Sequence, residues 1–106
     1  SVTAHCLKAD LLILDERVDE ALQEVELALA ENPHSQEALG RKLAGLYLAR
    51  KDQEAADLEA AMLARRPKPG IFYASAGELL EQRRQFSTAE RILRKAVEAS
   101  PHLANP

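Results

Sequence analysis

The chain has 106 residues, of which 46% are apolar and only 4% aromatic, and it carries a formal net charge of −3. This length fits one modest domain and argues against a two-domain enzyme, and the excess of aliphatic over aromatic residues favours helices over strands. The composition also argues against disorder, a collagen repeat and a membrane span, and the acidic balance argues against general nucleic-acid binding.

The first pair of helices is predicted over residues 3–14 and 17–31, with a turn at Asp15-Glu16. Pro33 ends the second of these helices, because proline lacks an N–H and its ring clashes with the preceding turn. Residues 1–35 hold eight acidic and two basic residues, so the acidic excess of the chain lies in this pair.

The second pair is predicted over residues 36–49 and 53–65, where apolar residues recur at helical spacing and not at alternate positions. Ser35 and Asp52 stand where a side-chain oxygen can cap a helix N-terminus. Arg50, at the break between the two helices, places positive charge at a helix C-terminus, which the macrodipole favours.

The third pair is predicted over residues 70–83 and 87–99, with a break at Arg84. Ser87 and Glu90 have the spacing of a capping box at the start of the last helix. The apolar face of that helix comprises Ala89, Ile92, Leu93, Ala96 and Val97.

Residues of one type recur every 34 positions along the chain. Prolines are scarce, so their recurrence at one phase of the period is the strongest part of this signal. The matching columns are Pro33, Pro67 and Pro101; Ala21, Ala55 and Ala89; and Leu12, Leu46 and Leu80. Each period therefore contains two helices and a short turn.

With this period, the sequence resembles the tetratricopeptide repeat family, whose 34-residue helix-turn-helix carries a W-x2-L-G-x2-Y, A-x3-F, A, P pattern. The third period matches best, through Tyr73, Ala76, Gly77, Leu80, Ala89, Leu93, Ala96 and Pro101. The resemblance implies an all-α fold, an α-solenoid of about six antiparallel helices stacked as a right-handed superhelix. Residues 1–106 would form a single domain of repeats spanning about 2–35, 36–69 and 70–103.

The register of the middle period is open. Strict 34-residue phasing puts Glu59 where a large apolar residue belongs. A slip of one residue would instead use Leu43, Ala44, Tyr47, Ala56, Ala60 and Leu63. The sequence does not choose between these registers.

The resemblance also implies a binding platform for peptides or protein segments, with a concave groove lined by the first helix of each pair. The groove positions carried over from the family are partly apolar and partly acidic. They are Thr3, Cys6, Asp10, Ile13, Glu37, Gly40, Ala44, Tyr47, Ile71, Ala74, Glu78 and Glu81. We expect a partner segment with apolar anchors and some positive charge, since opposite charge improves association rate and orientation.

One subclass of the family grips the C-terminal carboxylate of its partner with Lys, Asn and Arg side chains. The matching positions here are Cys6, Asp10, Arg41, Ile71 and Ser75. Only Arg41 could serve in this way, so we do not expect the chain to belong to that subclass.

No catalytic or metal-binding constellation is visible in the sequence. His5 and Cys6 are neighbours, but adjacent residues on a helix point about 100 degrees apart and so do not pair. No two histidines have metal-ligand spacing, and the chain lacks a glycine-rich phosphate loop. We therefore name no catalytic, cofactor or metal residue and expect no cofactor.

The leading interpretation is a non-enzymatic protein-protein interaction module that acts as a scaffold or adaptor. Two alternatives place it in a larger protein: a segment of a bacterial envelope assembly or secretion machine, or a regulatory segment of an enzyme elsewhere in the chain. A small helical enzyme or ligand-binding bundle remains an alternative if the period is accidental. The pair before the last helix cannot cover its whole apolar face, which predicts either a longer array, of which this chain is a fragment, or self-association.

Overall fold

The computed structural model describes residues 1–99, which form six α-helices joined by short turns, with no strand among them. The helices are α1 (Val2–Leu14), α2 (Val18–Glu31), α3 (Gln36–Leu48), α4 (Asp52–Arg65), α5 (Gly70–Gln82) and α6 (Phe86–Ala99). All six predicted helices are present, and each predicted end lies within one residue of the observed end. Pro101 and the end of the predicted third repeat lie outside the described residues.

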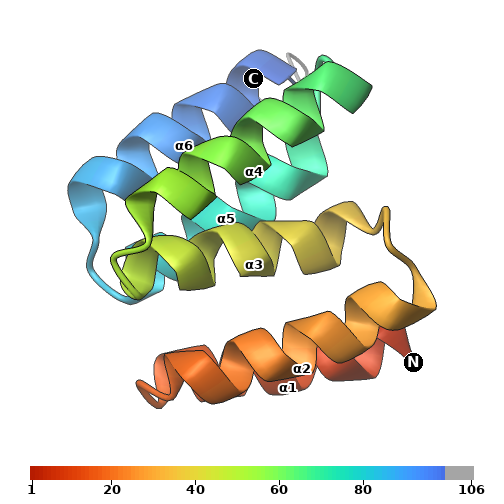
Figure 1. Ribbon diagram of the computed structural model, residues 1–106. Coiled ribbons are helices and arrows are strands. Elements are labelled where there is room, and N and C mark those ends of the chain that lie inside the picture. Colours follow the sequence, from red (N-terminus) through yellow and green to blue (C-terminus); the bar gives the residue numbers. More distant parts are fainter. Residues whose placement is uncertain (100–106) are drawn as a thin grey trace.

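The helices form three hairpins, α1 with α2, α3 with α4, and α5 with α6 (Figure 1). Helix α3 lies in the middle of the molecule and packs against both α2 and α5, so it connects the first hairpin to the third. The Cα radius of gyration is 12.7 Å. A compact domain of about 100 residues has a radius near 13 Å, so the stacked hairpins close into a globule.

The turn inside each hairpin has the same backbone geometry. Glu16, Arg50 and Arg84 have φ angles of 62°, 62° and 63°, in the left-handed region. In the first turn the N–H of Arg17 donates to the carbonyl of Leu12 at 2.8 Å and that of Glu16 to Ile13 at 3.1 Å, and both bonds recur in the other two turns. These are the paired bonds of a Schellman cap, so the 34-residue period of the sequence is present in the backbone.

The predicted helix caps are confirmed only in part. The Ser35 hydroxyl accepts a hydrogen bond from the N–H of Ala38 at 3.1 Å, as a cap should. The prediction for Asp52 is wrong, because Asp52 is the first residue of α4 and the N-cap position belongs to Lys51. Helix α6 begins at Phe86, so Ser87 lies inside the helix and does not cap it.

Small residues allow the hairpins to approach closely. A Cβ atom added to Gly40 of α3 would lie 2.6 Å from the backbone oxygen of Phe72 and 2.8 Å from the Cβ of Ser75, both in α5. A Cβ atom added to Gly77 would lie 2.5 Å from a methyl group of Leu93 in α6. The alanines of the recurring column, Ala21, Ala55 and Ala89, are buried in the same core.

Helix α4 follows the strict 34-residue register. Ala55, Glu59 and Met62 are its buried residues. Ala56 and Ala60, which the one-residue slip would bury, are exposed, so that alternative is wrong. Glu59 thus occupies the core position that Val25 occupies in α2.

Helix α4 is also the element least closely packed on the others. Among the described helices, no Cα atom of α4 lies within 8 Å of a Cα atom in α5 or α6, and α4 approaches only α3 that closely. The space between α4 and the third hairpin is bridged by long polar side chains around Glu59.

Candidate functional site

The structure places the predicted groove residues in three environments. Four of them are buried and cannot touch a partner on the surface: Cys6, Ile13, Gly40 and Ala44. Asp10, Tyr47 and Ala74 are half-buried. The exposed members are Thr3, Glu37, Ile71, Glu78 and Glu81. The exposed part of the predicted site is therefore mostly acidic, with one large apolar side chain.

The first helices of all three hairpins meet at a surface hollow of about 250 Å³. Asp10 of α1, Arg41 of α3 and Glu78 of α5 line it, together with Ser75 and Gln82. The hollow thus brings together two predicted groove residues, Asp10 and Glu78, that lie 68 positions apart in the sequence.

Arg41 is engaged within the protein. Its Nε and Nη2 donate to the two carboxylate oxygens of Asp10 at 2.9 and 3.1 Å, and its Nη1 donates to the carbonyl of Glu37 at 3.0 Å. A bidentate pair of this kind is among the stronger charge-assisted interactions. Arg41 therefore holds α1 against α3, which leaves Glu78 as the carboxylate at this hollow without a recorded ion pair among the described residues.

Arg83 links the third hairpin to the first at one end of this face. Its Nη1 donates to the carbonyl of Ile13 at 2.8 Å, and its Nη2 lies 3.7 Å from a carboxylate oxygen of Glu16. These contacts run directly from the third hairpin to the turn of the first. The sequence gives no sign of this bridge, because it depends on how the hairpins stack.

Tyr47 lies away from the other groove residues, in a polar cluster formed by Tyr47, Glu59, Tyr73, Arg91 and Lys95. The Tyr47 hydroxyl donates to Glu59 and accepts from Arg91 at 2.7 Å. The Glu59 carboxylate also lies 3.5 Å from Arg91 and 3.7 Å from Lys95. Burial, followed by the negative charge of Glu59, raises the pKa of Tyr73 to about 12. In the sequence, this cluster is indicated by Glu59, which occupies a position where the 34-residue period predicts a large apolar residue.

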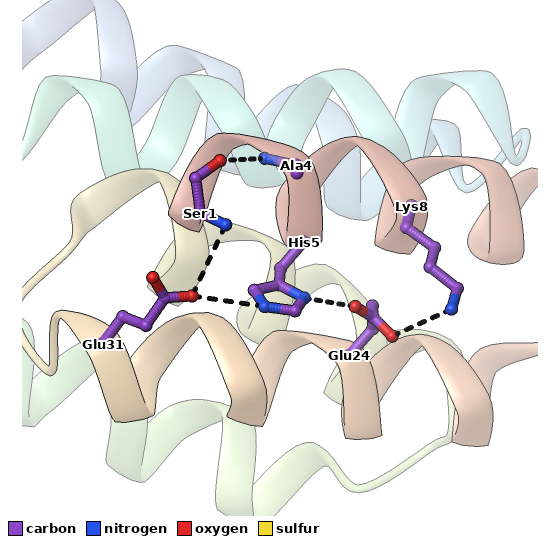
Figure 2. A network of polar contacts seen from close by, with 6 residues as sticks. All are labelled: Ser1, Ala4, His5, Lys8, Glu24 and Glu31. Carbon is purple, nitrogen blue, oxygen red and sulfur yellow. Dashed lines mark hydrogen bonds and ion pairs between the residues drawn. The ribbon is translucent and has the colours of Figure 1, made fainter.

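A second polar network lies between α1 and α2 (Figure 2). The His5 ring is held between two carboxylates: Nδ1 contacts Glu24, and Nε2 lies 3.2 Å from Glu31. Lys8 approaches the other oxygen of Glu24 at 3.4 Å. The hydrogen bond from His5 lowers the pKa of Glu24, and the positive charge of Lys8 acts in the same direction against the effect of burial.

His5 and Cys6 point into different surroundings. The Cys6 side chain is buried beside Ala28 and Ala38, while His5 faces the carboxylates of α2. Burial raises the pKa of the Cys6 thiol, which disfavours the thiolate form needed for nucleophilic attack. The two side chains therefore do not make a nucleophile and base pair.

Within residues 1–99, no group of three or more His, Cys, Asp and Glu side chains is arranged to hold a metal ion. None of the helices there is both long enough and apolar enough to cross a membrane. Comparison with family models, curated protein sequences and solved structures gives no match to this chain.

Proposed function

We propose that the chain is a non-enzymatic protein-interaction module, a scaffold or adaptor with a tetratricopeptide-like repeat. It takes a peptide or protein segment along the face formed by α1, α3 and α5. The observation that carries this proposal is the hollow to which all three hairpins contribute through their first helices. The recurrence of one turn geometry every 34 residues supports the repeat assignment.

The chemistry of the exposed groove residues suggests the partner. Glu37 and Glu78 give this face a negative charge, and Ile71, whose exposed fraction is 54%, offers an apolar contact. Glu81 lies instead at a hollow beside Phe86 and Leu93 of α6. A segment with positive charge and an apolar anchor would complement both features. Arg41 is already paired with Asp10, so a carboxylate-terminated partner finds no free guanidinium there.

The proposal can be tested with two designed peptides that share leucine anchors and differ only in carrying lysines or glutamates at the remaining positions. Fluorescence anisotropy should show saturable binding of the lysine peptide to the chain and much weaker binding of the glutamate peptide. The double substitution Glu37→Lys and Glu78→Lys should reverse this preference.

The matched control changes two exposed acidic residues on another helix, Glu54→Lys and Asp57→Lys in α4. This variant has the same net charge as the groove variant, so it should retain the preference for the lysine peptide if binding occurs on the proposed face. Equal losses in the two variants would mean that the peptide responds to overall charge, and the proposed face would be refuted.

A further inference from the structure

The outward side of α6 carries an apolar stripe interrupted by one pair of opposite charges. We call Phe86, Glu90, Leu93, Arg94 and Val97 the α6 face; together with Ala89 and with Glu81 of α5, these residues line one open hollow of about 520 Å³. Phe86 is 60% exposed and Val97 39% exposed, and both line this same hollow. Within the described residues, no other helix covers this face.

In the first repeat, the positions equivalent to the α6 face form a packing surface. The residues that lie two 34-residue periods before those of the α6 face are on α2, and they are Val18, Leu22, Val25, Glu26 and Leu29. The four apolar residues among them are buried or half-buried, and Leu22 packs at Gly45 of α3. In the first hairpin this surface is covered by the next hairpin, whereas in α6 the equivalent surface faces solvent.

The order of residues on the α6 face is self-complementary. Phe86 and Val97 lie at equal sequence separations on either side of the midpoint between Arg91 and Ile92, and Glu90 and Arg94 lie equally spaced about Ile92. When two α6 helices run antiparallel about a twofold axis near this point, each Phe86 meets Val97 of the second copy. Each Glu90 then lies opposite Arg94 of the second copy, so opposite charges meet twice.

We propose that the α6 face is a homodimer interface, and that its occupant is the α6 face of a second copy in antiparallel orientation. The Glu90 and Arg94 side chains, which pair within one helix at 2.6 Å and are each 69% exposed, exchange partners across the twofold axis. Closed twofold dimers are the commonest symmetric assemblies, and a face that carries both members of a charge pair satisfies their requirement of self-complementarity.

A second exposed apolar stripe, formed by Leu7, Leu11 and Leu14 on α1, is a poorer occupant. Inside the molecule Lys42 of α3 pairs with Glu26 of α2 at 2.9 Å. If a second copy continued the repeat after α6, its Lys8 would occupy the position equivalent to Lys42. It would then face Arg94 of the first copy, which occupies the position equivalent to Glu26. Head-to-tail stacking would thus replace an ion pair with two like charges, which opposes association.

Sedimentation equilibrium over a range of concentrations tests the proposal. The unmodified chain should dimerise reversibly. E90R and R94E, each studied separately, should weaken the dimer by about tenfold, because like charges then face each other across the axis. An equimolar mixture of the two variants should recover association as a heterodimer, since the E90R copy is basic at both positions and the R94E copy is acidic at both.

Two further variants locate the interface. F86S removes the exposed apolar contact and should also shift the chain toward monomer, whereas L11E on the α1 stripe should leave the dimer unchanged. Circular dichroism of every variant checks that the helices persist. A monomeric unmodified chain, a mixture that fails to recover association, or a dimer that L11E disrupts would each overturn the proposal, and none of these results bears on peptide binding at the α1, α3 and α5 face.

Discussion

At the scale of single residues, the three turns store a modest strain that the sequence could relieve. Glu16, Arg50 and Arg84 adopt a left-handed backbone, which costs a residue with a Cβ atom about 1–2 kcal/mol and glycine much less. Glycine is the usual residue at this position of a Schellman cap, yet this chain uses charged residues in all three turns.

We therefore expect Arg50→Gly to stabilise the protein. Arg50 is exposed, so the substitution removes strain without loss of packing. Part of the gain is offset by the greater freedom of glycine in the unfolded chain, which leaves about 0.5–1 kcal/mol in the free energy of unfolding. Urea denaturation measures this, with Arg66→Gly as the control: Arg66 has φ of −146°, so glycine should bring no gain there.

Tyr73 gives the protein a pH dependence in the alkaline range. Its pKa is about 12 in the folded protein, above the ordinary tyrosine value of about 10, so the folded state holds the phenol proton more tightly than the unfolded state. The unfolding free energy should consequently fall as pH rises from about 10 to about 12.

Tyr73→Phe isolates this effect. The Tyr73 hydroxyl is buried with no hydrogen-bond partner in the described part of the chain. Its removal should therefore raise the free energy of unfolding by about 1 kcal/mol at neutral pH. Unfolding curves of both proteins at neutral and alkaline pH should show a smaller alkaline loss in the variant. Parallel losses in the two proteins would contradict the assignment to Tyr73.

At the scale of secondary structure elements, Glu59 attaches α4 to the rest of the fold together with Ala55 and Met62, which are buried in the apolar core. The Glu59 side chain is only 8% exposed, and its partners Arg91 and Lys95 are 45% and 38% exposed. Glu59→Ala would leave Tyr47 without its acceptor and the two cations free to turn toward water. We expect a loss of about 2 kcal/mol, below the 3–5 kcal/mol typical of a fully buried pair.

Glu59→Leu should recover much of that loss, because leucine restores the apolar residue that the repeat has at Val25 in α2. Native-state hydrogen exchange would show where the effect falls. In Glu59→Ala the amides of α4 should exchange faster while those of α3 and α5 change little. If α4 kept its protection in Glu59→Ala, its attachment would have to come from apolar contacts alone.

The six helices and their ends could be predicted from the sequence because their determinants are local. The proline positions, the helical spacing of apolar residues and the Ser35 cap act within one or two turns of chain. The exposed groove could not be predicted in the same way. Gly40 is buried by the close approach of α3 to α5, and Tyr47 turns away because Glu59 offers it an acceptor. Both depend on contacts between hairpins.

At the scale of the whole molecule, two arginines on the groove side bind the hairpins together. Arg41 links the first hairpin to the second through Asp10, and Arg83 links the first to the third through the Ile13 carbonyl and Glu16. Together they fix the spacing of α1, α3 and α5. The proposed peptide-binding face is therefore held by polar contacts at its surface as well as by the apolar core.

Arg83→Ala tests whether this spacing matters for the whole molecule. The substitution leaves the Ile13 carbonyl without the guanidinium donor and removes the one ion pair that joins the first and third hairpins within residues 1–99. This should lower the unfolding free energy by about 1–2 kcal/mol. Small-angle X-ray scattering should show a radius of gyration larger than that of the unmodified protein, because the third hairpin can move away from the first.

The neighbouring Arg84→Ala is the control: Arg84 is exposed at the next position and should change stability by no more than about 0.5 kcal/mol. An unchanged radius and a loss equal to that of the control would mean that the apolar packing of α3 on α5 sets the width of the face by itself.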